Sequence, residues 1–156
     1  MLDSQTSNQH FRIAEQLIAY YPDVTINTIM HSKLSIPAVL SHITETYSPN
    51  LVANLNKEYD IKIARTQGEF IWHAHPETDE FFYILSGSLT LEIEGEKGME
   101  GIALEKGDVF VVPRGVKHRP VGDAEIMLIE KVGVMNTGDA GRSEFTKEVA
   151  DARLVE

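Results

Sequence analysis

Four residues have the types and the spacing to hold a metal ion: His73, His75, Glu80 and His118. His73 and His75 are two residues apart in a β-rich stretch, and side chains at i and i+2 point to the same face of a strand. Their Cα atoms would lie ~6.6 Å apart, and two imidazoles can reach one ion from that separation. The pair therefore predicts two nitrogen ligands side by side.

Glu80 and His118 complete the set from two other stretches. Glu80 begins the next predicted strand and shares a face with Phe82 and Ile84, where a buried carboxylate needs a cation or a hydrogen-bond partner. His118 follows the run DVFVVPRGVKH, in which a proline and a glycine suit a corner that turns the histidine back toward the interior. A lone His-x-His pair is weak evidence, so the prediction depends on all four residues together.

Three imidazoles and one carboxylate suit a divalent transition metal ion, namely Fe, Mn, Zn, Ni or Co. The chain has no cysteine, so there is no thiolate to favour zinc, and the nitrogen ligands disfavour Ca and Mg. We expect Fe or Mn in the cell. Glu80 is also the candidate catalytic residue, because a carboxylate that leaves the ion can act as a general base.

Short β-rich runs fill the chain after residue 51, and Gly, Pro, Asp or Asn separate most of them. In the first run Tyr59, Ile61 and Ile63 share one face. No long helical pattern occurs in this half, which disfavours a βαβ fold. The pattern predicts an all-β barrel or sandwich with strands over 59–65, 69–75, 80–85, 88–94, 108–112 and 125–132.

Apolar residues recur at helical spacing over 10–20, and Pro22 follows, so a short helix is expected there. The stretch 24–46 is compatible with short strands, with a helix after Pro37, or with both. We therefore expect three parts, in which an extension packs on a barrel and a tail follows it: 1–50, 51–135 and 136–156. Within the tail, residues 143–152 are compatible with a short helix.

The composition excludes several classes of function. The net charge is −10 and no basic patch is evident, which disfavours nucleic-acid partners. The N-terminus lacks the pattern of a signal peptide, and no apolar run reaches the 18 residues that a membrane span needs, so a cytoplasmic protein without a membrane partner is expected. The expected partners are a small-molecule substrate and a second copy in a homodimer, since the edge strands of a small barrel need covering.

Two motifs carry a resemblance to a known family. GEFIWHAHPETDEFFYILSG, residues 68–87, resembles the first motif of the cupins, and GDVFVVPRGVKHRPVG, residues 107–122, resembles the second. The chain is most similar to small single-domain cupins that also carry an NTGD segment, here Asn136–Asp139, and that are often labelled mannose-6-phosphate isomerase-like. The resemblance implies a double-stranded β-helix (jelly-roll) barrel with a three-histidine, one-carboxylate metal site. It implies no particular reaction, because one fold hosts many chemistries.

Three functions remain open from the sequence. The first is a metal-dependent enzyme acting on a small polar organic molecule by dioxygenase, isomerase or lyase/cyclase chemistry. The second is a non-catalytic module that binds a small ligand or the metal. The third, a sugar-phosphate isomerase, ranks last because a phosphate needs several basic residues around the cavity and only Arg114 and Lys117 are suitably placed.

Overall fold

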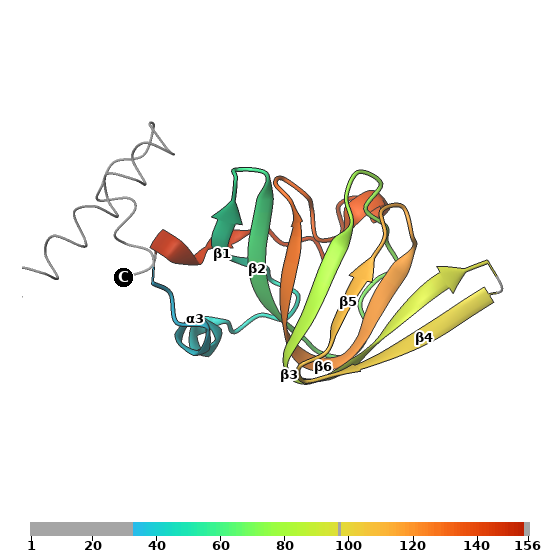
Figure 1. The fold of residues 1–156 in the computed structure, drawn as a ribbon, viewed down its shortest axis with the longest axis horizontal. Helices are drawn as coiled ribbons and strands as arrows, with labels where there is room; N and C mark the ends of the chain where they lie inside the picture. Colours follow the sequence, from blue (N-terminus) through green and yellow to red (C-terminus); the bar gives the residue numbers. More distant parts are fainter. Residues whose placement is uncertain (1–32, 97, 155–156) are drawn as a thin grey trace, which may run out of the picture. The chain divides into compact units, whose positions relative to one another are not determined.

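Within residues 33–96 and 98–154, the parts that the computed structural model describes, β-strands are the main elements (Figure 1). Seven strands form one sheet in the order β4-β3-β6-β2-β1-β7, and β5 pairs with β3. The all-β prediction is confirmed. The strands are β1 (Asn50–Leu55), β2 (Tyr59–Thr66), β3 (Glu80–Gly95), β4 (Gly98–Glu105), β5 (Val109–Val112), β6 (His118–Lys131) and β7 (Ala150–Asp151).

Two long strands, β3 and β6, pair antiparallel along most of their length and form the frame of the barrel. The sequence predicted a break within β3, but one strand runs through it and bends at a bulge between Ile84 and Ser86. Gly87 follows with φ of 74°, and a Cβ there would overlap the carbonyl oxygen of Asp123 on β6. Glycine therefore lets the two strands stay paired while they curve.

The interior of the barrel is apolar at one end. Alternate residues of β3 and β6 point inward and form a single buried cluster that includes Phe82, Ile84, Leu89, Leu91, Ala124, Ile126 and Leu128. The inner face of β2 differs, because Asp60, Lys62 and Thr66 are all buried there. Tyr59, Ile61 and Ile63 share one face of β2, as predicted. This is the face turned away from the interior of the barrel.

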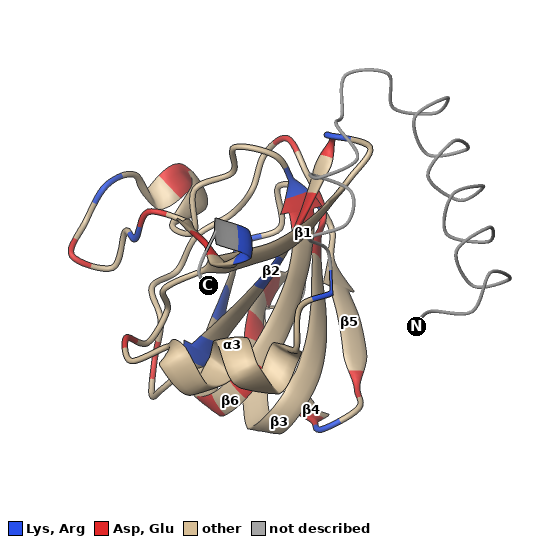
Figure 2. Cartoon of the chain, turned by 90° about the vertical axis from the view of Figure 1, so that its left-hand side faces the viewer, with Lys and Arg blue, Asp and Glu red and all other residues tan. Residues whose placement is uncertain are grey.

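In the described part of the chain, the short helix α3 (Ile36–His42) precedes the strands, and Pro37 lies in its first turn, where a missing backbone N–H costs nothing. A helix near Pro37 was one of the alternatives for 24–46, and it is present; residues 24–32 of this stretch lie outside the described residues. Figure 2 shows α3 beside the sheet. The helix borders a surface groove whose other wall is formed by Arg65, Leu85 and Glu125. The helix expected over 10–20, and its packing on the barrel, lie outside the described residues. Of the helices in the described residues, none has the length and apolar character needed to cross a bilayer.

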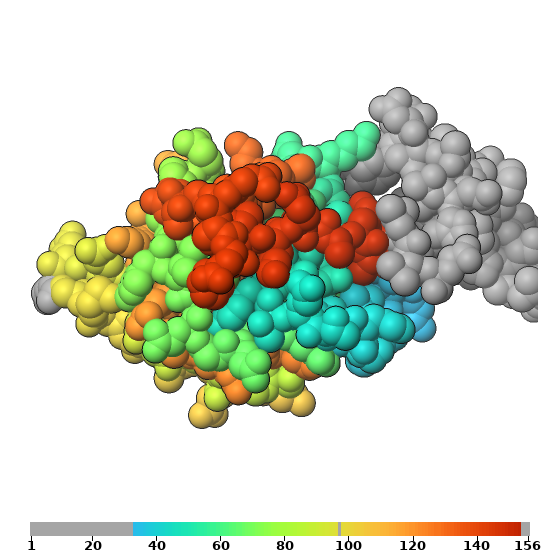
Figure 3. Space-filling model, turned by 180° about the vertical axis from the view of Figure 1, so that it is seen from behind, coloured from blue at the N-terminus to red at the C-terminus, as the bar shows by residue number. Residues whose placement is uncertain are grey.

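The segment after β6 lies over one face of the barrel (Figure 3). It contains the 3-10 turns η1 (Gly138–Ala140) and η2 (Ala152–Leu154) and the strand β7, which pairs parallel to β1. The side-chain amide of Asn136 donates to the carbonyl oxygens of Tyr47, at 3.1 Å, and Phe145, at 2.9 Å. The short helix with which residues 143–152 are compatible does not form: this stretch contains turns, an extended segment and β7.

Candidate metal centre

The structure brings the four sequence-predicted side chains together. One ligand atom from each of His73, His75, Glu80 and His118 lies within 4.8 Å of the other three. The residues are 3%, 4%, 5% and 0% exposed, so water cannot solvate the carboxylate and the imidazoles freely. Donor atoms of these types this close together could hold one metal ion.

Backbone hydrogen bonds hold two of the histidines next to each other. The N–H of His73 donates to the carbonyl of His118 at 3.0 Å, and the N–H of His118 donates back at 2.9 Å. The carbonyl of His75 accepts from Gly115, in the corner before β6. The strand expected over 69–75 is therefore an extended segment with isolated bridges, at Glu69 and His73, to the β6 side of the barrel.

Two carbonyl oxygens orient the imidazole rings. Nδ1 of His73 lies 3.0 Å from the carbonyl oxygen of Ile71, and Nδ1 of His118 lies 3.0 Å from that of Val116. A carbonyl oxygen only accepts, so each Nδ1 carries the proton. In the neutral ring the lone pair then belongs to Nε2, which is the arrangement that a metal-binding histidine needs.

The donor set fits a cation. Nε2 of His118 lies 2.9 Å from Oε2 of Glu80, and Nε2 of His75 lies 3.4 Å from the same oxygen. Since Nδ1 of His118 already carries its proton, Nε2 and the carboxylate would face each other as two electron-pair donors. A proton or a metal ion between them removes this repulsion. Three imidazoles and one carboxylate are ligands that divalent transition metals prefer.

The pKa values follow from burial and from Glu80. Burial lowers the pKa of His73 to about 4, so this ring is neutral at pH 7. Burial also opposes the charge on His75, but the hydrogen bond and negative charge of Glu80 raise its pKa overall. For Glu80, burial raises the pKa, and hydrogen bonds from His118 and His75 outweigh it and hold that pKa well below its ordinary value.

Residues 138 and 139 contact the backbone of Ala74, which lies between His73 and His75. The N–H of Asp139 donates to the carbonyl of Ala74 at 2.9 Å, and its carboxylate accepts from the N–H of Ala74 at 2.7 Å. Gly138 has φ of 48°, and a Cβ there would overlap the Ala74 carbonyl oxygen and lie 3.2 Å from Nδ1 of His75. The NTGD segment marked these residues in the sequence, but nothing in it indicated this contact.

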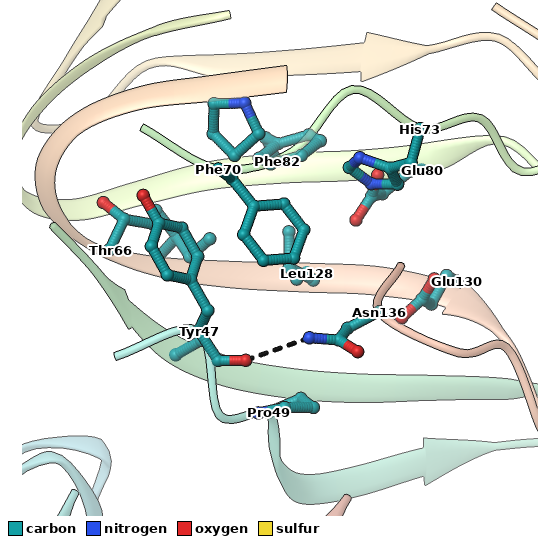
Figure 4. A pocket seen from close by; sticks show the side chains of 13 residues that line it. Tyr47, Pro49, Thr66, Phe70, His73, Glu80, Phe82, Leu128, Glu130 and Asn136 are labelled. Carbon is teal, nitrogen blue, oxygen red and sulfur yellow. Dashed lines mark hydrogen bonds between the residues drawn. The ribbon is translucent and has the colours of Figure 1, made fainter. Parts of the chain in front are cut away.

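A cavity opens beside the four residues, and His73 and Glu80 form part of its wall (Figure 4). It is small, with a volume of about 40 Å³, and it opens to solvent. Phe70 stacks on Tyr47 with ring centroids 4.5 Å apart and meets His73 edge-on at 5.3 Å. The remaining wall is mainly apolar and is formed by Pro49, Ala64, Thr66, Phe82, Pro120, Ile126, Leu128, Glu130 and Asn136.

Glu130 is a functional candidate that the sequence analysis missed. It lies on the inner face of β6, is 2% exposed and lines the same cavity. Lys62 of β2 donates to its Oε1 at 2.9 Å. Burial and the nearby charge of Glu80 raise the pKa of Glu130 to about 7, against the opposing effect of Lys62. The sequence did contain a signal for it: Glu130 follows Ile126 and Leu128 at two-residue steps, so all three side chains point to the same face of the strand.

The two basic residues considered for a phosphate, Arg114 and Lys117, do not line this cavity. Arg114 borders a separate surface groove with Asp79 and Phe81, and Lys117 approaches Glu94 at 4.0 Å. No lysine or arginine lies among the described residues that form the cavity wall.

Comparisons with known proteins agree with this architecture. Residues 61–130 match the family model described as "Cupin domain". An uncharacterized protein of Bacillus subtilis, YdbB, is 28% identical over 90 residues, which are 58% of this chain and 76% of that protein. The tetracenomycin polyketide synthase protein TcmJ of Streptomyces glaucescens is 36% identical over 47 residues, 30% of this chain and 29% of its own length.

Solved structures give the same result. The crystal structure of a cupin-2 domain containing protein from Shewanella frigidimarina superposes with a TM-score of 0.60 and 30% identity, over 66% of this chain and 98% of that one. Hydroquinone 1,2-dioxygenase PnpCD, solved in complex with Fe3+, superposes with a TM-score of 0.56 at 16% identity, over 63% and 32%, which is a likeness of fold. The fold, the two sequence motifs and the Shewanella relative together establish that the chain belongs to the cupin family.

Proposed function

We propose that this cupin binds one divalent transition metal ion through His73, His75, Glu80 and His118 and uses it to bind and convert a small organic molecule in the adjacent cavity. The observation that carries this proposal is the convergence of four buried donor side chains, two of which, His73 and Glu80, line an apolar cavity. When bound, the ion would supply Lewis-acid chemistry to an oxygen of the molecule, or dioxygen chemistry if it is iron.

The residues around the site would have three different roles. The carbonyl groups of Ile71 and Val116 keep two rings oriented with Nε2 free for the ion. Phe70, Phe82 and Leu128 give the cavity an apolar wall that excludes water from the site and contacts the body of the ligand. Glu80 supplies the negative charge that a divalent cation needs.

The charged residues in the cavity wall help to rank the reactions left open by the sequence. The wall of the cavity contains two carboxylates and no cationic side chain among the described residues, so a sugar phosphate would meet repulsion. Phenols and 1,3-diketones fit better, since each combines an apolar body with an oxygen for the metal. The alternative function is a non-catalytic module, in which the same site holds a ligand without turnover.

Elemental analysis of the purified protein and of two histidine variants tests the proposal. We expect about one ion per chain in the wild type and in His42→Ala, because His42 is exposed on α3, away from the four donors. His75→Ala should lose stoichiometric metal. Unchanged metal content in His75→Ala would refute the site. Turnover of phenols or 1,3-diketones by the metal-loaded protein, against binding alone, separates the enzyme from the module.

A further inference from the structure

A second buried carboxylate stands next to the candidate metal centre. Phe81 of β3 pairs with Ile129 of β6, so Glu80 and Glu130 occupy the next position along their two strands. Residues opposite each other on neighbouring antiparallel strands have Cβ atoms about 5 Å apart. Both glutamates line the cavity (Figure 4). The barrel therefore presents two acidic groups to the same small space.

Only one oxygen of Glu130 is satisfied. Oε1 accepts from Nζ of Lys62 at 2.9 Å, and the two side chains are 3% and 1% exposed. The ammonium group also donates to the carbonyl oxygen of Val134 at 3.4 Å, and Lys62 is not among the residues that line the cavity. Oε2 is buried and has no hydrogen-bond partner among the described residues. Buried carboxylate oxygens are almost always hydrogen-bonded, so an unpaired one in a cavity wall points to a missing donor.

We propose that Glu130, held by Lys62, accepts a hydrogen bond at Oε2 from an O–H or N–H group of the ligand whose oxygen binds the metal. This assignment rests on the proposed function and narrows its substrate class. The ligand combines an apolar body, a metal-binding oxygen and a neighbouring hydrogen-bond donor. A second anionic group in that position is disfavoured, because it would face a carboxylate whose neutralising lysine is already engaged.

An ion pair that only stabilises the fold would not need to lie in the wall of a cavity. Replacing a buried ion pair by apolar side chains of similar volume is often neutral for stability, so the pair is weak evidence of a structural role. Here one member faces a cavity beside three imidazoles, and the other comes from β2 and holds it there. Lys62 is accordingly a positioning residue, and Glu130 is the group that contacts the ligand.

Two matched probes test the assignment. Acetohydroxamic acid offers oxygen atoms to a metal and keeps an N–H donor, whereas N-methylacetohydroxamic acid offers the same oxygen atoms without that donor. We would load the full chain with Co(II), measure cobalt content in every sample, and titrate each probe by the visible absorption of cobalt. At a pH above the pKa of Glu130, the wild type should bind the N–H probe about tenfold more tightly, as expected for a hydrogen bond to a charged acceptor.

The preference should fall to near unity in Glu130→Gln and persist in the matched control Glu94→Gln, whose side chain is 59% exposed. The double variant Lys62→Met/Glu130→Gln removes both charges and should retain metal while losing the preference, which keeps the test usable if the single variant does not fold. A preference retained without the Glu130 carboxylate overturns the assignment, as does a wild type that holds cobalt and shows no preference. A wild type that holds no cobalt refutes the proposed metal site itself.

Discussion

The contact between Gly138 and Ala74 gives the most demanding prediction about the site. A methyl group at position 138 would overlap the carbonyl oxygen of Ala74, and it would lie 3.0 Å from the carbonyl carbon. Ala74 separates His73 from His75, and Asp139 fixes its backbone through two hydrogen bonds. Gly138→Ala must therefore move either the tail segment or the pair of histidines.

The expected size of the effect has two parts. An alanine held at φ of 48° costs about 1–2 kcal/mol relative to glycine. Forcing a methyl group into a closely packed contact costs about 1–3 kcal/mol more. Because the displaced backbone supports two proposed ligands, metal affinity should fall by about 10-fold to 100-fold, as it does when groups that orient ligands are removed.

Gly133→Ala is the matched control. Gly133 also has a left-handed φ, of 81°, but a Cβ there meets nothing within 4 Å. Gly133→Ala should therefore lose only the stability that an alanine at a left-handed φ costs, and it should retain the metal affinity of the wild type. Denaturant unfolding of the metal-free proteins gives the stabilities, and competition with a chelator gives the metal affinities. If both variants lose the same stability and keep the same affinity, the tail segment does not support the histidines and the reasoning is wrong.

Three further predictions concern the buried charges. Glu80→Gln should weaken metal retention in a chelator competition while leaving the circular dichroism spectrum unchanged; a variant that unfolds even with metal would assign Glu80 to structure instead. Lys62→Met alone should cost about 1–3 kcal/mol in denaturant unfolding, because it leaves the buried carboxyl group of Glu130 without its partner, whereas Lys62→Met/Glu130→Gln should recover most of that loss; equal losses in the two proteins would contradict the buried pair. The pKa of Glu130, raised from its ordinary value of 4.5 to about 7 in the folded chain, means that the metal-free native state binds the proton more tightly than the unfolded chain. The stabilising contribution is thus present below pH 4.5 and is lost as the pH rises through 7, and Glu130→Gln should remove a loss of roughly 3 kcal/mol between pH 4.5 and 8 from the stability profile.

The four candidate ligands could be found from the sequence because their signal is local. His73 and His75 need only an extended backbone to point the same way, and Glu80 needs only the strand phase that it shares with Phe82. The regular strand predicted over 69–75 is wrong, yet an extended segment with isolated bridges gives the same convergence. The type of element mattered less than the direction of the backbone.

The partners of these residues depend on contacts between distant parts of the chain. Lys62 and Glu130 are 68 residues apart. Lys62 lies on the more polar face of β2, with Asp60 and Thr66, which the alternation predicts to be exposed. The strand of Glu130 has apolar residues on both faces, so the pattern does not reveal which face is inside. The support of Ala74 by Gly138 and Asp139 spans a similar separation. Such pairs are set by the pairing of β2 with β6 and by the path of the tail, and neither follows from local spacing.

Strand boundaries failed for a related reason. The Ser-Gly-Ser sequence after Leu85 suggested a gap, because glycine usually weakens a strand, but here it allows β3 to bend without losing its partner. The strands β1 and β4 were missed, since NLVANL and GMEGIALE are poor in β-branched residues and rich in Asn, Gly or Glu. Their pairing with neighbours overrides these weak local preferences.

The reciprocal backbone bonds between His73 and His118 bear on how the site would acquire metal. Since these bonds and the two ring-orienting carbonyls are formed by the polypeptide alone, the entropic cost of ordering the ligands is met when the chain folds. An incoming ion would then find a rigid receptor. Exchange of one metal for another could proceed through the mouth of the barrel without any unfolding, and discrimination between metals would depend on cellular supply more than on rearrangement of the protein.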